Sequence, residues 1–110
     1  MSLATVYTRA NIAIDAPLVC VETHLSNGIP SMTIVGLPET AVKESRERVR
    51  SAILNAKLEF PARRITINLA PADLPKSSGR FDLAIALSIL AASEQIPATA
   101  LSAYEFLGEL

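Results

Sequence analysis

The chain has 110 residues, half of them apolar, with a formal net charge of −1 and one cysteine. This size favours one domain with limited stability, and the near-neutral charge excludes a global basic field for nucleic acid. Cys20 has no disulfide partner, the start of the chain lacks a signal-peptide pattern, and the apolar run 83–92 is too short for a bilayer, so we expect a cytoplasmic protein with no membrane partner.

The first half of the chain predicts three strands followed by a helix. Residues 5–14 and 18–25 are rich in β-branched side chains, which is typical of strands. The turn signal Ser26-Asn27-Gly28 predicts an antiparallel hairpin between the second strand and a third at 31–35. Apolar residues recur at helical spacing in 39–57, and we expect the opposite, charged face of this helix to be solvated or to lie at a subunit contact.

The second half predicts a strand, a polar loop and a buried helix. Residues 64–69 alternate between polar and apolar, and a loop follows that carries two prolines, a lysine, two serines and a glycine. The helix expected from 80 to 94 is apolar nearly all round, which implies burial on more than one side. Residues 104–110 look like a fifth strand inside which the chain stops, so we expect 1–110 to be one domain truncated from a larger protein.

These elements predict an α/β (α+β) fold. The hairpin signal, the amphipathic first helix and the buried second helix favour a two-layer sandwich. We expect a mixed or largely antiparallel sheet that carries the two main helices on one face.

Three segments identify the family that the chain resembles. They are HLSNGIPSMTIVGLPETAVKESRERVRSAI (24–53), FPARRITINLAPADLPKSSGRFDLAIALSILAA (60–92) and FLGEL (106–110). They resemble the N-terminal domain of the Mg-chelatase-like AAA+ proteins associated with bacterial competence. The resemblance implies a Lon-protease-like fold, related to the ribosomal-protein-type sandwich, with an attached AAA+ module after it.

The resemblance also implies a role for the whole protein. Full-length members are implicated in DNA branch migration during natural transformation, and the resemblance implies a homo-oligomeric ring that uses ATP and Mg²⁺. The chain itself has no G-x-x-x-x-G-K-[ST] motif, so we expect no cofactor and no ATP hydrolysis in these 110 residues. We expect instead a non-catalytic module that serves assembly or DNA contact.

The loop before the second helix decides between this function and its alternative, a residual Ser/Lys peptidase of the Lon type. Alignment with the Lon-type active-site segment places Arg80 where the nucleophilic serine would be, and a guanidinium stays protonated. Ser77 or Ser78 with Lys76 as base is the remaining option, but adjacent side chains in an extended segment point apart. Ser78 fits better as a helix cap. We therefore expect no catalytic residues.

Four cations flank the fourth strand and its loop. Arg63, Arg64, Lys76 and Arg80 are candidate DNA or phosphate contacts on a local basic rim. The alternative is a solvated surface with ion pairs.

Two further polar residues favour structural roles. Asp82, in the first turn of its helix, is expected to pair with Arg80 or Arg64. His24 lacks enough neighbouring ligands for a metal, so we expect no metal site.

Overall fold

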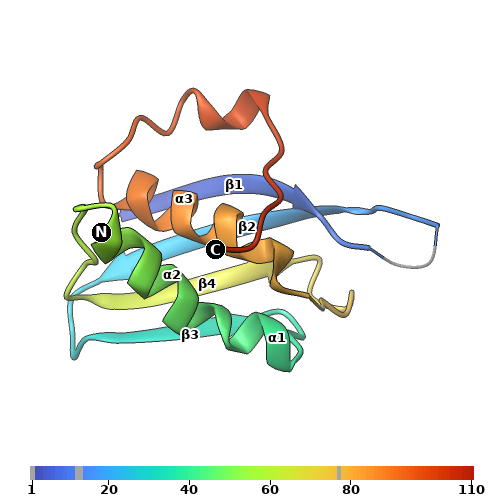
Figure 1. The fold of residues 1–110 in the computed structure, drawn as a ribbon, viewed down its shortest axis with the longest axis horizontal. Helices are drawn as coiled ribbons and strands as arrows, with labels where there is room; N and C mark the ends of the chain where they lie inside the picture. The colour runs from blue at the N-terminus through green and yellow to red at the C-terminus, as the bar shows by residue number, and fades with distance from the viewer. Residues whose placement is uncertain (1, 12–13, 77) are drawn as a thin grey trace.

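The computed structural model describes residues 2–11, 14–76 and 78–110, and its centre is a four-stranded mixed sheet (Figure 1). The regular elements, in chain order, are β1 (Ser2–Arg9), β2 (Leu18–Ser26), β3 (Ser31–Val35), α1 (Thr40–Lys43), α2 (Ser45–Asn55), β4 (Arg64–Ala70), the 3-10 turn η1 (Gly79–Phe81), α3 (Asp82–Ala92) and the 3-10 turn η2 (Leu101–Ala103). The first strand lies within the predicted range 5–14 only in part, and positions 12–13 of that prediction lie outside the described residues.

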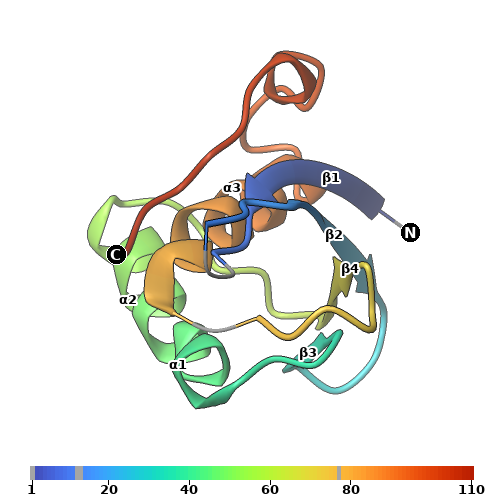
Figure 2. The ribbon, with the colours of Figure 1, turned by 90° about the vertical axis from the view of Figure 1, so that its right-hand side faces the viewer.

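The molecule has two layers, with the sheet on one side and α2 and α3 on the other (Figure 2). Alternate residues of β1, β2 and β4 point towards the helices and are buried, whereas the residues between them are half-buried or exposed. Phe81 of η1 and Ile85 and Ile89 of α3 belong to the same core. The predicted two-layer fold, with both main helices on one face, is confirmed. Among the described residues, no helix has the length and apolar character needed to cross a membrane.

The strand order is β1-β2-β4-β3, so the predicted hairpin between β2 and β3 is wrong. The turn after Ser26 is present, but β4 lies between the two strands, antiparallel to β2 and parallel to β3. Parallel neighbours require a long crossover, which α1 and α2 provide. The physical reason for the central place of β4 is its apolar alternation, because Ile65, Ile67 and Leu69 are all buried under the helices.

The helices begin and end close to the predicted positions, with one break in each. Glu44 divides the first predicted helix into α1 and α2, and the second begins with the turn η1 before α3. The predicted apolar face of the first helix is confirmed, because Val42, Val49 and Ile53 are buried.

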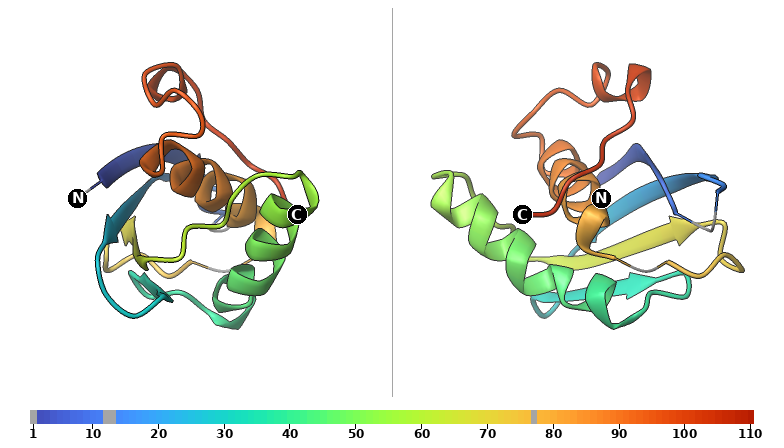
Figure 3. Two further views of the ribbon diagram at one scale, coloured as in Figure 1. Left: turned by 90° about the vertical axis from the view of Figure 1, so that its left-hand side faces the viewer. Right: turned by 45° about the vertical axis from the view of Figure 1, so that its right-hand side comes forward.

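Residues 104–110 do not form the predicted fifth strand. The only pairing with the sheet in the described residues is a single bridge from Glu105 to Tyr7, with Phe106 N–H donating to the Tyr7 carbonyl at 2.9 Å. The segment then leaves β1 and runs past the start of α3 to α2, where the chain ends (Figure 3). After the bond to Tyr7, its next backbone bonds join Gly108 to Arg80 of η1 and to Leu83 of α3.

Candidate functional site

The loop between β4 and η1 is fixed to the loop between β3 and α1. Lys76 N–H donates to the Leu37 carbonyl at 3.1 Å, and Glu39 N–H donates to the Lys76 carbonyl at 2.8 Å. Gly36, directly after β3, lies very close to Leu69 of β4. Only glycine fits there, because its φ is +112° and a Cβ would collide with the Leu69 carbonyl group. The two loops therefore form one rigid corner at the end of β3 and β4.

Lys76 is buried in this corner, with none of its surface exposed. Its ammonium group donates to the Pro71 carbonyl, and burial lowers the pKa of Lys76 against a smaller opposing effect of Asp73. The expectation that Lys76 lies on an exposed rim is therefore wrong. The sequence suggested exposure because a loop lysine is usually solvated, whereas here the loop folds back over its own side chain.

Ser78 caps the turn that follows, as predicted. Its hydroxyl accepts from the Arg80 N–H at 3.2 Å, and its φ of 91° turns the chain into η1. Ser77, the other serine proposed as a nucleophile, lies outside the described residues. Arg80, which the sequence comparison with Lon-type proteases is expected to place at the nucleophile position, is exposed.

Asp82 is fully buried at the start of α3, and its partner is Arg48 of α2. One carboxylate oxygen accepts from Arg48 Nε at 2.7 Å and from the Leu110 N–H at 3.1 Å, while the other accepts from the Ser45 hydroxyl. The predicted pairing with Arg80 or Arg64 is wrong. Hydrogen bonding to Asp82 raises the pKa of Arg48, so the guanidinium of Arg48 stays charged.

The terminal segment lies against the loop in which a Lon-type nucleophile would be placed. Gly108 N–H donates to the Arg80 carbonyl, and the Gly108 carbonyl accepts from the Leu83 N–H, both at 3.0 Å. The Glu109 side chain packs on Gly79, where any Cβ would need it to move. Backbone and side chains of this corner are thus engaged in internal packing.

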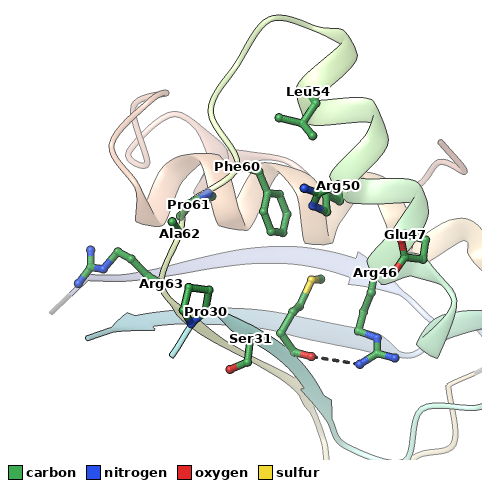
Figure 4. Close-up of a pocket in the computed structure, with 11 residues that line it drawn as sticks. Pro30, Ser31, Arg46, Glu47, Arg50, Leu54, Phe60, Pro61, Ala62 and Arg63 are labelled. Atoms are coloured by element: carbon green, nitrogen blue, oxygen red, sulfur yellow. Dashed lines mark hydrogen bonds between the residues drawn. The ribbon is translucent and has the colours of Figure 1, made fainter. Parts of the chain in front are cut away.

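The remaining predicted contacts do not form a single rim. Arg63 and Arg64 lie at the start of β4, and Arg80 follows its other end, about 20 Å away for a strand of this length. Arg64 precedes the buried Ile65 and lies on the uncovered face of the sheet, whereas Arg63 lines a groove beside α2 (Figure 4).

Comparison with known proteins supplies the family. The family model for subunit ChlI of Mg-chelatase matches residues 21–110. Over all 110 residues the chain is 64% identical to the uncharacterized protein YifB of Salmonella typhimurium and 62% identical to the competence protein ComM of Haemophilus influenzae. It is 37% identical over the same length to an uncharacterized protein of Mycobacterium bovis.

The chain belongs to this Mg-chelatase-like, ComM-like family. It covers 22% of the length of each of these relatives. The predicted family is therefore confirmed.

Gly36 and Gly79 do not form a glycine-rich phosphate-binding loop. A phosphate-binding loop needs several free glycines before a helix, but Gly36 packs on Leu69 and Gly79 packs on Glu109. Nor do the described residues contain a group of three or more His, Cys, Asp or Glu side chains arranged to hold a metal ion. His24 lies half-buried on the uncovered face of the sheet.

Sequence reasoning missed two arginines, Arg46 and Arg50, that share the groove with Arg63. The predicted charged face of the first helix placed them in solvent, together with Arg48. Arg48 has Glu44 one turn earlier, and that ion pair is present at 3.8 Å. Arg46 has no acidic residue three or four positions away in either direction. This difference in helical neighbours was the available signal for Arg46. It does not mark Arg50, because Glu47 lies three positions before it.

Proposed function

We propose that this chain is a non-catalytic module of a competence-associated, Mg-chelatase-like ATPase that moves DNA branches during natural transformation. In this proposal ATP and Mg²⁺ are bound elsewhere in a full-length protein, and several copies assemble into a homo-oligomeric ring. The module positions DNA or neighbouring subunits. The name of the Haemophilus relative, a competence protein, supports the biological context.

One observation carries the non-catalytic part of the proposal. The charged groups of the loop are committed to the fold, since Lys76 donates to a main-chain carbonyl and Asp82 is held by Arg48, Ser45 and Leu110. A general base must be within reach of the proton that it removes. A buried ammonium group bonded to Pro71 does not meet this requirement, and Ser78 is occupied as a cap.

A labelling experiment tests the absence of peptidase chemistry. The full-length protein is treated with a fluorophosphonate probe, and we expect no covalent adduct on Ser77 or Ser78 by mass spectrometry. An adduct that disappears in Ser77→Ala or Ser78→Ala would establish an activated serine and overturn this part of the proposal.

A salt titration tests DNA contact. Arg64 and Arg80 are exposed, so reversing both charges in Arg64→Glu/Arg80→Glu should weaken binding of duplex DNA by the full-length protein at low salt. The slope of log affinity against log salt should fall by about 0.9 for each phosphate that is no longer bound. A matched control reverses two other exposed cations, in Lys43→Glu/Lys57→Glu. Equal affinities and slopes in the two double variants would exclude a duplex contact at Arg64 and Arg80.

A further inference from the structure

A groove of about 470 Å³ lies between α2 and the segments that lead into β3 and β4. Its volume is within the range of small-ligand sites, and it is open at the surface (Figure 4). One wall is made by Arg46, Arg50 and Leu54 of α2, and the other by Pro30, Met32 and Arg63. Phe60 lies between the walls, with its ring directed into the space.

The groove is lined by arginines whose charges have no carboxylate partner among the described residues. Arg46, Arg50 and Arg63 line it, and Glu47 is the one acidic residue among its lining side chains. In the described part of the chain, no carboxylate is within ion-pair distance of these three arginines, whereas Arg9 and Arg48 both have one. The guanidinium groups of Arg46 and Arg50 concentrate positive potential at this concave surface, so an anion entering the groove is stabilised. Arg63 also lines the groove, but its guanidinium is directed away from Phe60 and α2 (Figure 4).

One arginine is oriented by the backbone. Arg46 Nη1 donates to the Met32 carbonyl at 3.3 Å, which holds its guanidinium at the mouth of the groove and uses one of five N–H donors (Figure 4). A guanidinium with free N–H groups forms paired hydrogen bonds to phosphate oxygens. The groove therefore offers a directed phosphate contact as well as a diffuse field.

Phe60 adds a surface for a planar group. It packs on the hydrophobic core but is only partly buried, and the guanidinium carbon of Arg50 lies 5.9 Å from its ring centroid. Aromatic rings and guanidinium planes together are the usual partners of unstacked bases in single-strand binding. Leu54, Met32 and the two prolines supply the remaining apolar surface.

We infer that this groove binds a nucleotide unit of single-stranded nucleic acid, with a backbone phosphate on Arg46 and Arg50 and a base against Phe60. The inference rests on the proposed function and deepens it, because it places one DNA contact and specifies its strand state. A base inside a duplex is stacked on its neighbours and does not reach Phe60. An acidic protein segment would satisfy the arginines but would leave the ring without a planar partner.

The experiment measures binding of a fluorescent oligo-dT to the full-length protein by anisotropy at several salt concentrations. Arg46→Glu/Arg50→Glu should weaken binding and lower the salt slope by about 0.7 for each phosphate that is no longer bound. Lys43→Glu/Lys57→Glu, with the same change in charge outside the groove, should retain the wild-type affinity and slope. A folded groove variant that binds like this control overturns the inference.

Phe60→Leu separates base contact from charge. Leucine retains much of the packing on the core, and loss of stacking should weaken oligo-dT binding by at least fivefold, the lower end of about 1–3 kcal/mol per base. Polyphosphate and poly-glutamate have no bases, so the affinity of each competitor should be the same for wild type and Phe60→Leu. Unchanged oligo-dT affinity in folded Phe60→Leu, or poly-glutamate that displaces oligo-dT as well as unlabelled oligo-dT does, would overturn the assignment to nucleic acid.

The outcomes also separate this inference from the proposed function. If the groove variants bind oligo-dT normally while Arg64→Glu/Arg80→Glu loses duplex binding, the groove is excluded and the DNA-contact role stands. If all of these variants behave like the lysine control, both are wrong.

Discussion

Arginines on opposite sides of α2 have opposite environments. Arg48 reaches the buried Asp82 and lies in a network with Ser45 and Leu110, whereas Arg46 and Arg50 face a groove whose lining includes one acidic residue, Glu47. Residues two positions apart on a helix point in nearly opposite directions. One face of α2 therefore has its charge neutralised inside the fold, and the other presents charge to a ligand.

The comparison shows that a charged residue near a conspicuous loop is not necessarily part of a binding surface. The loop from Pro71 to Asp82 has the polar composition of an active-site loop, but Lys76 and Asp82 are buried and bonded within the chain. The groove is formed by residues of an ordinary helix and of the turn before β4. Unpaired charge, more than the density of polar residues, distinguishes the surface that is open to a partner.

The largest expected effect comes from breaking the neutralised side. Asp82→Ala leaves Arg48 without its internal partner, and removing one member of a buried pair costs about 3–5 kcal/mol. Arg48 retains 27% side-chain exposure, so partial rehydration should place the loss in the free energy of unfolding near the lower end, about 3 kcal/mol. Urea denaturation measures it. Arg80→Ala, two positions away and exposed, should change stability by less than about 0.5 kcal/mol. Equal urea midpoints for Asp82→Ala and Arg80→Ala would contradict the assignment of Asp82 as the buried partner of Arg48.

A second prediction concerns the corner that buries Lys76. Gly36→Ala forces a side chain into a φ of +112° and against Leu69, and we expect a loss of more than about 2 kcal/mol. Gly28→Ala is the matched control, because its φ is also positive but the nearest atom to an added Cβ is 3.9 Å away. A smaller cost for Gly36→Ala than for Gly28→Ala in thermal unfolding would show that the close approach is unimportant.

The third prediction uses the lowered pKa of Lys76. The unfolded chain, with the ordinary lysine pKa of 10.5, binds this proton more strongly than the folded chain does. Stability should therefore rise with pH between the lowered folded pKa and 10.5, and be lowest below that window. Lys76→Met removes the effect, so the difference in unfolding free energy between wild type and variant should shift in favour of wild type as pH rises. A constant difference across this pH range would mean that the ammonium is effectively solvated.

Much of the fold was predictable because local patterns set it. The alternation in β4 and the helical spacing of Val42, Val49 and Ile53 identify buried faces without knowledge of the partner. The pairing of β3 was not predictable from its turn, since a turn signal fixes where a chain reverses but not which strand fills the gap. That choice depends on which strand buries the most apolar surface, a property of the whole sheet.

The candidate site was less predictable because its decisive contacts are distant in sequence. Arg48 and Asp82 are 34 positions apart, and the burial of Lys76 requires the meeting of two loops. Spacing rules describe neighbours within one element and are silent on such contacts. The cap at Ser78, by contrast, is a local interaction and was predicted correctly.

The smallest loss of stability is expected from breaking an ion pair that is partly exposed to solvent. Arg9 and Glu105 form two hydrogen bonds, at 2.8 and 2.7 Å, between β1 and the terminal segment, and their side chains are 39% and 41% exposed. The hydrogen bond from Arg9 lowers the pKa of Glu105 below its ordinary 4.5. The stabilisation is therefore present above pH 4.5 and is lost as pH falls through the lowered folded pKa.

Glu105→Gln should reveal this dependence. The stability difference between wild type and variant should be small at neutral pH, decrease further with added salt because exposed pairs are screened, and vanish in acid. The Asp82 network is shielded from solvent, so added salt should leave the Asp82→Ala loss nearly unchanged. If salt reduced both losses by the same proportion, the distinction between an internally neutralised charge and a solvent-facing one would fail for this protein.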